Sequence, residues 1–368
     1  MKTFLFGVSE GKITGQLNTV LGVKKSLGDD NNFVFVNVPH KSYMAPMCFF
    51  IYFYKLFKIL MNGRSNPRIY LFLNRTRMSF WLRDLPVFLV AKCVSDKLIC
   101  HLVGSDINYF LSSLSKFELR LLRFCFTGIN RWVVLGPDMQ RQVEVAYAGV
   151  NLAPPLSTTF FHNPGLLPAE VDMFVGSALT ESPIPNERHL NVGYMSNFIE
   201  EKGIVQFIDA VIYLNEVLNF NVSGWVAGSF IGKPSKSVLA SMSSIEGKSY
   251  LSNLGMLTNQ AKWDRLLSND ILILPTYYKS ESLPLSLVEA MRAGCYCISS
   301  DVGEIGSLLA ADRGFILNDL RAESIAEAVV VASSSCAFGK HRLAAMKYAG
   351  SVFSFERFKL RVENVLDF

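Results

Sequence analysis

The chain has 368 residues, a length that suits two domains of ordinary size better than one. Half of the residues are hydrophobic and 18% are charged, a composition that argues against intrinsic disorder and allows a large buried core. Seven cysteines are scattered without paired spacing, so reduced thiols in a cytoplasmic setting are the simpler expectation than a disulfide framework.

Positive charge is concentrated in the N-terminal part of the chain, although the net charge is only +5. Residues 1–165 carry 19 Lys and Arg against 9 Asp and Glu, whereas residues 166–368 carry 17 against 22. A basic N-terminal part favours an anionic partner, either a nucleic acid or an acidic membrane surface.

Two apolar segments raise the question of membrane insertion. The run at 2–8 ends too early for the core of a signal peptide and predicts a buried strand. The longest run, "MAPMCFFIYFYKLFKILM" at 44–61, is interrupted by Lys55 and Lys58 before it reaches the roughly 20 apolar residues of a spanning helix. The sequence therefore predicts no transmembrane segment, and a helix that lies on a membrane surface remains open.

The first 165 residues alternate short apolar runs with segments of helical pattern. Continuous apolar runs are typical of parallel strands that are covered on both faces. These candidate strands lie at 2–8, 32–38, 68–74, 97–104 and 131–136. The segments between them are long enough for crossover helices, so the pattern predicts a doubly wound α/β domain.

A second alternating series follows a stretch at 162–189 that is rich in proline and turn formers. Its candidate strands lie at 190–196, 222–229, 250–255, 270–276, 296–301 and 314–318. We expect two doubly wound domains that face each other across a cleft. The predicted parts are an N-terminal Rossmann-like domain at 1–165, a linker at 166–187, a C-terminal Rossmann-like domain at 188–345, and a C-terminal helix at 346–368 that packs back on the first domain.

Two acids stand eight positions apart in the stretch "ESLPLSLVEAMRAGC", residues 281–295. The strand at 270–276 precedes it, Pro284 suits the start of a helix, Ser282 can cap it and Gly294 ends it. Helix starts favour phosphate, and carboxylates suit the vicinal hydroxyls of a sugar. Glu281 and Glu289 could therefore grip a nucleotide-sugar.

The alternative is structural. Glu281 would then be solvated, and Glu289 would pair with Arg292 or Arg265 on a helix face. The spacing of the two acids does not by itself distinguish the two interpretations.

The stretch 281–309, "ESLPLSLVEAMRAGCYCISSDVGEIGSLL", resembles the E-x7-E signature of family four of the retaining glycosyltransferases, which have the GT-B fold. Upstream, "LNVGYMSNFIEEKGIVQFIDAV" at 190–211 resembles that family's glycine and Lys-Gly segment. Between them, 250–276 resembles its segment under the nucleotide base. The resemblance runs over about residues 190–310 in the right order and is much weaker in the N-terminal half.

This resemblance implies roles for particular residues of the donor site. Glu289 would bind the ribose hydroxyls, Glu281 the transferred sugar, and Lys202 the diphosphate as the leaving group departs. Further donor contacts would come from the backbone at Ser282 and Leu283, from Gly193 and Tyr194, and from Met256 and Leu257 against the base. Transfer would retain the anomeric configuration without a firm catalytic base, and no metal or other cofactor is expected.

One departure from the family concerns the position after Gly193. Family members often have an arginine there that helps to bind diphosphate, whereas this chain has Tyr194. Lys279 and Arg77 are the candidate replacements for this cation, and weaker diphosphate binding is the alternative.

In the N-terminal half, "GKITGQL" at 11–17 matches the place of the family's glycine-rich loop near the donor phosphates, and Gly11 and Gly15 would allow a close backbone approach. An ordinary βα turn is the alternative. "HLVGSDINYF" at 101–110 resembles the family's H-G-x-D turn through Gly104 and Asp106, with Val103 at the usual histidine position. The resemblance makes His101 and Asp106 catalytic candidates.

The alternatives for these two residues are a structural histidine at a strand end and an N-cap of the following helix. "FFHNPG" at 160–165 resembles the strand end that leads to the hinge, and Asn163 and Gly165 are interpreted as turn residues.

Residues 41–92 combine nine Lys and Arg with a single acid, Asp84, and with interleaved aromatic residues. This pattern is typical of an interfacial helix that is attracted to anionic lipids. A core-facing helix with solvated cations is the alternative. No RNA- or DNA-binding motif is present, so nucleic acid is not expected as a partner.

Together these features predict a cytoplasmic retaining glycosyltransferase, peripheral on the inner face of the cell membrane. It would move a sugar from a nucleotide-sugar to a lipid-linked or oligosaccharide acceptor in the biosynthesis of a surface polysaccharide such as O-antigen or capsule. The alternatives are a nucleotide-sugar epimerase of the same fold and a non-catalytic nucleotide-sugar-binding protein.

Overall fold

The computed structural model describes residues 2–7, 15–27, 33–37, 45–61, 66–73, 76–105, 107–155, 157–160 and 189–366. The predicted linker at 166–187, Gly11, Asp106, Asn163 and Gly165 lie outside these residues. The chain divides into two compact units. Unit 1 comprises Met1–Pro164 together with Phe355–Phe368, and unit 2 comprises Gly165–Ser354.

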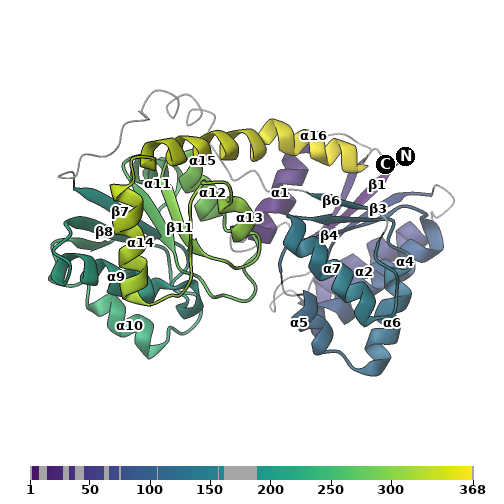
Figure 1. Cartoon of the computed structure of the whole chain (residues 1–368). Helices are drawn as coiled ribbons and strands as arrows, with labels where there is room; N and C mark the ends of the chain where they lie inside the picture. The colour runs from purple at the N-terminus through teal and green to yellow at the C-terminus, as the bar shows by residue number, and fades with distance from the viewer. Residues whose placement is uncertain are drawn as a thin grey trace. The chain divides into compact units, whose positions relative to one another are not determined.

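Unit 1 contains a six-stranded sheet in which every strand pair is parallel, with the order β2-β1-β3-β4-β5-β6 (Figure 1). The strands are β1 (Thr3–Gly7), β2 (Phe33–Asn37), β3 (Arg68–Leu73), β4 (Leu98–Leu102), β5 (Arg131–Val134) and β6 (Thr158–Phe160). The five predicted strands are all present, and β6 is an addition that the apolar pattern did not single out.

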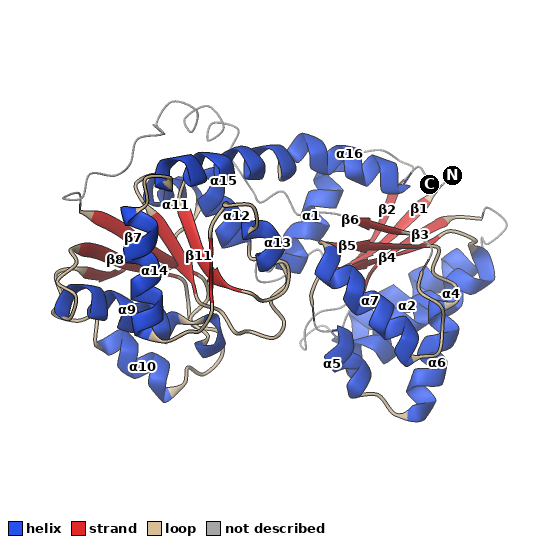
Figure 2. Cartoon of the chain, viewed as in Figure 1, coloured by secondary structure: helices blue, strands red, loops and turns tan. Residues whose placement is uncertain are grey.

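The helices of unit 1 connect these strands and cover both faces of the sheet (Figure 2). They are α1 (Gly15–Leu27), α2 (Ala45–Met61), α3 (Arg77–Ser79), the π-helical turn η2 (Phe80–Asp84), α4 (Leu85–Val94), α5 (Ile107–Ser112), α6 (Lys116–Phe126), α7 (Pro137–Gly149) and α16 (Phe355–Leu366). The expected crossover helices are therefore present.

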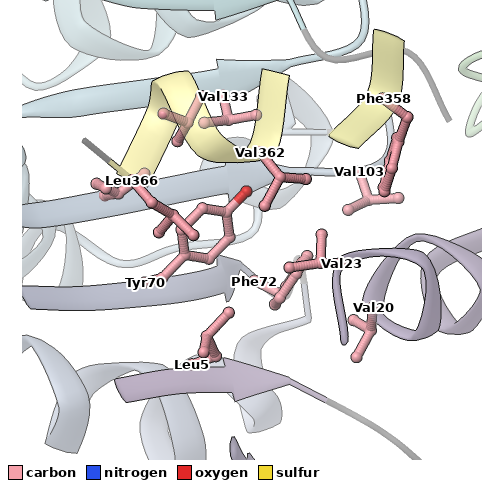
Figure 3. Packing of buried hydrophobic residues seen from close by; sticks show 12 residues of the cluster. Leu5, Val20, Val23, Tyr70, Phe72, Val103, Val133, Phe358, Val362 and Leu366 are labelled. Carbon is pink, nitrogen blue, oxygen red and sulfur yellow. The ribbon is translucent and has the colours of Figure 1, made fainter. Parts of the chain in front are cut away.

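The core on one face of this sheet is shared by the first and the last helix of the chain. Figure 3 shows Val20 and Val23 of α1, and Phe358 and Val362 of α16, around the strand residue Phe72. All five side chains are at most 2% exposed. Burying a large apolar side chain contributes about 1.5–3 kcal/mol, so α16 is an integral part of unit 1 although it is last in sequence.

Unit 2 contains a second six-stranded parallel sheet, with the order β12-β11-β10-β7-β8-β9. The six predicted strands are all present, as β7 (Leu190–Met195), β8 (Val222–Ala227), β9 (Leu251–Asn253), β10 (Ile271–Leu274), β11 (Tyr296–Ser300) and β12 (Phe315–Leu317). The helices of the unit are the 3₁₀ turn η3 (Glu200–Lys202), α9 (Ile204–Glu216), α10 (Lys236–Ser243), α11 (Asn259–Leu267), α12 (Leu285–Arg292), α13 (Ile305–Leu309), α14 (Ala322–Ser334) and α15 (Phe338–Val352).

The last two helices show where the chain passes from unit 2 back to unit 1. The boundary predicted between residues 345 and 346 falls inside α15, which runs on to Val352. The change of unit comes between Ser354 and Phe355. The apolar pattern of residues 338–352 does not reveal this boundary, because both helices bury side chains and only the sheet that each one covers differs.

None of the helices in the described part of the chain combines the length and the apolar character that a membrane span requires.

Candidate functional site

The strand order of unit 2 marks a place where a ligand can bind. Numbered from β7, the order is 3-2-1-4-5-6, and the winding of the chain reverses between β7 and β10, which are parallel neighbours. Ligands of open α/β sheets bind beyond the carboxyl ends of the strands at such a point. Lys202 follows β7 and Glu281 follows β10, so both belong to this edge of the sheet.

Backbone contacts join the loop after β7 to the loop after β10. The backbone N–H of Tyr277 donates to the carbonyl oxygen of Glu201 at 2.8 Å, and the Thr276 hydroxyl donates to the same oxygen at 3.2 Å. Gly203 has a φ of +82°, and a Cβ atom there would lie 2.1 Å from the carbonyl oxygen of Pro275. A glycine is therefore required for the two loops to come together.

These joined loops bring Lys202 and Glu281 into an ion pair. The Nζ atom of Lys202 donates to Oε2 of Glu281, and it also lies 4.9 Å from the centre of the Tyr278 ring. The side chains of Lys202 and Glu281 are only 13% and 8% exposed. A largely buried lysine at the carboxyl end of a strand is a suitable partner for an incoming anion.

The loop after β11 supports the Glu281 loop from the other side. The backbone N–H of Glu304 donates to the carbonyl oxygen of Ser282 at 2.7 Å. Gly303 has a φ of +58°, and a Cβ atom there would lie 2.4 Å from the carbonyl oxygen of Glu281. The backbone on both sides of Glu281 is thus held by contacts with the loops after β7 and β11, which gives a ligand group a fixed target.

Helix α12 begins one residue later than predicted. Pro284 occupies the N-cap position with an extended backbone, and the helix runs from Leu285 to Arg292. The N-cap residue is therefore Pro284 and not the predicted Ser282. Gly294 follows with a φ of +78°, as its predicted role in helix termination requires.

Glu289 lies inside α12 and is buried, with 7% of the residue exposed. Its Oε1 atom accepts a hydrogen bond from Nζ of Lys262 at 2.6 Å. Burial raises the pKa of Glu289, and the charge and hydrogen bond of Lys262 act in the opposite direction. The second acid of the motif therefore also has a lysine partner.

The structural alternative for Glu289 named two arginines, and the structure places both in other contacts. Arg292 donates to the carbonyl oxygen of Phe353 at 3.2 Å. The guanidinium of Arg265 lies 5.1 Å from the centre of the Trp225 ring. The ion pair of Glu289 is with Lys262, from α11, which the sequence did not single out.

The other predicted donor contacts in unit 2 differ in how much surface they present. Ser282 and Leu257 are half-buried, and Leu283 is 8% exposed. Met256 is 65% exposed, as a side chain that packs against an incoming base can be. Lys279 is exposed in the loop after β10, two residues before Glu281.

Gly193 and Tyr194 lie in the core of unit 2, where a ligand has no access to them. A Cβ atom at Gly193 would lie 2.2 Å from the Trp225 indole, so this glycine makes room for a buried tryptophan. Tyr194 is 0% exposed, packs against Phe207 and donates from its hydroxyl to the carbonyl oxygen of Asn197 at 3.2 Å. Their predicted role as direct donor contacts conflicts with this packing, because side chains within the core leave no surface for a ligand.

His101 is a core residue of unit 1 rather than an exposed group at a strand end. It lies within β4, is 0% exposed, and its Nδ1 atom is 2.8 Å from the hydroxyl of Tyr70. Burial lowers its pKa to about 3, so it is neutral at physiological pH. Phe72 stacks on its ring at 5.1 Å between centroids. This burial and packing do not support the predicted catalytic role of His101 and agree with the structural alternative.

Two further predicted residues belong to unit 1. Arg77 donates from Nε to Oε1 of Glu118 at 2.6 Å, and this carboxylate also accepts from the Trp81 indole at 2.7 Å. Arg77 is thus engaged within unit 1, which disfavours it as the replacement for the missing diphosphate-binding arginine. Gly15 is the first residue of α1.

Among the residues that the structure describes, no group of three or more His, Cys, Asp or Glu side chains is arranged to hold a metal ion.

Lys262 is the residue of this site that sequence reasoning missed. It lies 27 positions before Glu289 in another helix, and no motif links the two positions. An available signal was its place four residues after the segment "LGMLT" (254–258), which follows β9 at the edge of the sheet where Glu281 lies. That signal points to the region and does not select this lysine.

Residues 180–343 match the sequence model of the family "Glycosyl transferases group 1". This match lies within unit 2. The matched residues include both paired carboxylates, Glu281 and Glu289, so this part of unit 2 is similar to that family.

A curated relative is TuaC of Bacillus subtilis (strain 168), described as a teichuronic acid biosynthesis glycosyltransferase. It is 28% identical over 147 residues, which is 40% of this chain. The aligned part spans about a third of the relative's length.

Solved structures resemble the whole chain at low sequence identity. Alr3699/HepE of Anabaena, in complex with UDP-glucose, has a TM-score of 0.68 at 13% identity and is covered over 100% of both chains. Sucrose-phosphate synthase of Thermosynechococcus elongatus also has a TM-score of 0.68 at 13% identity, with 100% of this chain and 98% of that chain covered. The two parallel six-stranded sheets and these structural relatives confirm the predicted α/β fold of the GT-B class.

Proposed function

We propose that the protein is a retaining glycosyltransferase of family four that moves a sugar from a nucleotide-sugar to a lipid-linked or oligosaccharide acceptor in surface-polysaccharide biosynthesis. The observation that carries this proposal is the pair of buried carboxylates in unit 2, Glu281 and Glu289, each of which forms an ion pair with a lysine. The family match of unit 2, the UDP-glucose complex of a structural relative and the name of the curated relative support it.

The Lys202–Glu281 ion pair suggests how the donor would be received. A diphosphate carries more negative charge than one carboxylate and would attract Lys202. Glu281 would then accept hydrogen bonds from hydroxyls of the transferred sugar. Lys202 would counter the charge that develops on the diphosphate as the sugar–phosphate bond breaks, which is the main electrostatic task in such a reaction.

Lys279 is our choice for the second cation of the site. Tyr194 is buried and neutral, since burial raises its pKa far above the ordinary value. Lys279 is exposed and lies in the same loop as Glu281, whereas Arg77 belongs to unit 1 and forms an ion pair with Glu118. An exposed lysine gives weaker preorganisation than a buried arginine, so modest donor affinity is expected.

The activity test measures nucleoside diphosphate release from a panel of nucleotide-sugars, with a lipid-linked acceptor extract and with oligosaccharides. Glu281→Ala should lower turnover by about 10²–10³-fold, as the loss of one group that stabilises the transition state does in other enzymes. Glu246→Ala, at an exposed position of unit 2, is the matched control. Normal turnover of the Glu281 variant would contradict the assigned role.

Separate measurements test the retention of configuration, the independence of metal and the two alternative functions. NMR of the product reports whether the anomeric configuration is retained, and turnover in EDTA reports whether a metal is needed. Donor that is interconverted without any acceptor would favour an epimerase. Donor binding without transfer to the native acceptor would favour a non-catalytic binding protein.

We also propose that α2 docks unit 1 on the inner, anionic face of the cell membrane, which would make the protein peripheral and cytoplasmic. Tyr52, Leu56 and Ile59 form the buried stripe of this helix. The opposite side is apolar rather than charged, with large side chains that are 40–75% exposed. These are Phe50, Ile51, Phe53, Tyr54, Phe57, Leu60 and Met61.

The charges beside this face favour an anionic lipid surface. Lys55 and Lys58 lie on α2, and the only acid of α2, α3, η2 and α4 is Asp84, which is 1% exposed. The expected alternative, a core-facing helix with solvated cations, does not account for an outer face made of aromatic and aliphatic side chains. Interfacial helices bind through buried apolar area together with attraction to anionic lipids.

Co-sedimentation with liposomes tests the docking face. The double variant F53S/F57S should bind vesicles with anionic lipid at least about tenfold more weakly, because two aromatic side chains would no longer enter the interface. Leu239→Ser, at an exposed position of α10, is the control. Binding that is indifferent to lipid charge and to the double variant would remove this part of the proposal.

A further inference from the structure

Lys262 has the geometry of a support for Glu289. It lies in α11, its side chain is 17% exposed, and its Nζ atom contacts Oε1 of Glu289 at 2.6 Å. The same Nζ atom is 5.0 Å from the centre of the Trp263 ring, and Trp263 is 1% exposed. The lysine is thus held from two sides, by a buried aromatic ring and by the carboxylate.

Glu289 needs such a support because it is buried. Removing a carboxylate from water disfavours its charged form, and the pKa of Glu289 is raised for this reason. A protonated carboxyl group has one donor and less acceptor capacity, whereas two vicinal hydroxyls are best met by an acceptor-only carboxylate. The ion pair with Lys262 counters the effect of burial.

We propose that Lys262 is a positioning residue of the donor site, which keeps Glu289 ionised and directs its Oε2 atom toward the vicinal hydroxyls of the nucleotide. The inference rests on the proposed function, since it assumes that Glu289 binds a ribose. It adds a residue to which neither the motif nor the family resemblance gave a role.

Two neighbouring cations are less suited to this task. Arg292 and Arg265 contact the Phe353 carbonyl and the Trp225 ring, respectively. Lys202, the other buried lysine of the site, pairs with Glu281. Lys262 is accordingly the cation on which the ionisation of Glu289 depends.

A purely structural tie between α11 and α12 is the competing explanation. Loss of such a tie would lower the stability of unit 2, and any effect on ligand binding would be equal at all pH values. Loss of a positioning lysine has a different signature, because an unpaired buried carboxylate takes up a proton more readily. The pKa of Glu289 and the pH dependence of binding therefore separate the two explanations.

The first experiment needs no ligand. Carbon-13 NMR of glutamate carboxyl groups would follow the titration of Glu289 in the wild-type chain and in Lys262→Met, with Glu289→Gln to assign the signal. The titration midpoint should move to higher pH in Lys262→Met and stay close to the wild type in Lys262→Arg. An unchanged midpoint in Lys262→Met overturns the inference.

The second experiment measures calorimetric binding of UDP, GDP, ADP and dTDP between pH 5 and pH 9. Wild-type affinity should fall as the pH drops through the pKa of Glu289, and the midpoint should lie at higher pH in Lys262→Met. At low pH the variant should bind roughly tenfold more weakly, with convergence toward wild type at high pH. A loss that is equal at every pH overturns the positioning role.

The outcomes also separate this inference from the proposed function. If the wild-type chain binds none of the four nucleotides, the proposed function fails, while the NMR titration still decides the Lys262–Glu289 coupling. If the wild type binds and Lys262→Met binds equally at every pH, only the role of Lys262 fails. Should Lys262→Met unfold, Lys262→Gln carries both measurements, with thermal unfolding as the check on its fold.

Discussion

Unit 1 and unit 2 each contain a parallel six-stranded sheet with helices on both faces, but different side chains lie at the ends of their strands. The order in unit 1 is β2-β1-β3-β4-β5-β6, which reverses between β1 and β3, whereas the order in unit 2 reverses between β7 and β10. In unit 2 the loops beyond β7 and β10 carry the Lys202–Glu281 ion pair. In unit 1 the titratable side chain of β4, His101, is a neutral member of an aromatic core.

This difference shows that a shared sheet architecture does not determine where the functional side chains lie. Both sheets provide strand ends at which a ligand can bind, but the two carboxylates that we propose as the donor-binding groups, Glu281 and Glu289, are found in unit 2. Unit 1 instead presents an apolar outer face on α2. The comparison predicts that substitutions in unit 2 change donor chemistry and that those in the core of unit 1 change stability alone.

The largest expected effect is that of Lys202→Met, which removes the lysine that pairs with Glu281 where the strand order of unit 2 reverses. Transfer should fall by about 10²–10³-fold, because the charge of the leaving diphosphate loses a preorganised partner. Steady-state release of nucleoside diphosphate measures this effect, with Lys233→Met at an exposed position of unit 2 as the control. Equal losses in the two variants would show that the site depends on overall charge and not on this lysine.

A smaller effect is expected from Gly203→Ala, which pushes the loops after β7 and β10 apart. The new Cβ atom would meet the Pro275 carbonyl oxygen at 2.1 Å in a backbone with positive φ. Unit 2 should lose about 3 kcal/mol of unfolding free energy. Gly247→Ala also has a positive φ but meets nothing within 4 Å, so it should cost only about 1 kcal/mol.

Urea unfolding of both glycine variants measures these costs. If Gly203→Ala were no more destabilised than Gly247→Ala, the close approach of the two loops would not be important for the stability of unit 2.

The smallest effect concerns the pH dependence of unit 1 through His101. Its pKa is lowered from an ordinary value of about 6.5 to about 3, because the charged form is disfavoured by burial. The stability that this neutral histidine contributes is present above pH 6.5 and is lost as the pH falls toward 3. Each pH unit in this window costs about 1.4 kcal/mol, so roughly 2 kcal/mol is lost between pH 6.5 and pH 5.

Denaturant unfolding at pH 7 and pH 5 measures this loss, and the variant His101→Phe should show a smaller difference between the two pH values. Transfer activity per folded molecule should be the same in His101→Phe and in the wild type. A drop in kcat with normal stability would restore His101 as a catalytic candidate and would break the comparison between the two units.

The sequence predicted the parts that depend on local pattern. Eleven strands were marked by apolar runs. The twelfth, β6, was indicated only by the resemblance of residues 160–165 to a strand end, because Thr158–Phe160 is short and only partly buried. Glu281 and Glu289 were marked by their spacing after a strand and at a helix start, and the family resemblance selected them as site residues together with Lys202. Pro284 and Gly294 bounded the helix to within one residue, because their backbone preferences act locally.

The roles of individual side chains in the core were less accessible. A glycine at 193 matched a donor-binding position, but its neighbour across β8 is the Trp225 indole, which needs the space. A histidine at the end of an apolar run suggested catalysis, yet the ring of Phe72 and the hydroxyl of Tyr70 surround it. Both errors arose because the residues that decide the environment lie on other strands.

By itself, the sequence determined that this chain forms two parallel α/β sheets and that two acids follow its tenth strand, because apolar runs, turn residues and helix boundaries are encoded within a few neighbouring residues. The tertiary structure alone decided that Glu289 is paired with Lys262, that the chain returns to unit 1 at Phe355, and that His101 is neutral. These outcomes depend on packing between distant segments, where burial and the nearest charge set the state of each side chain.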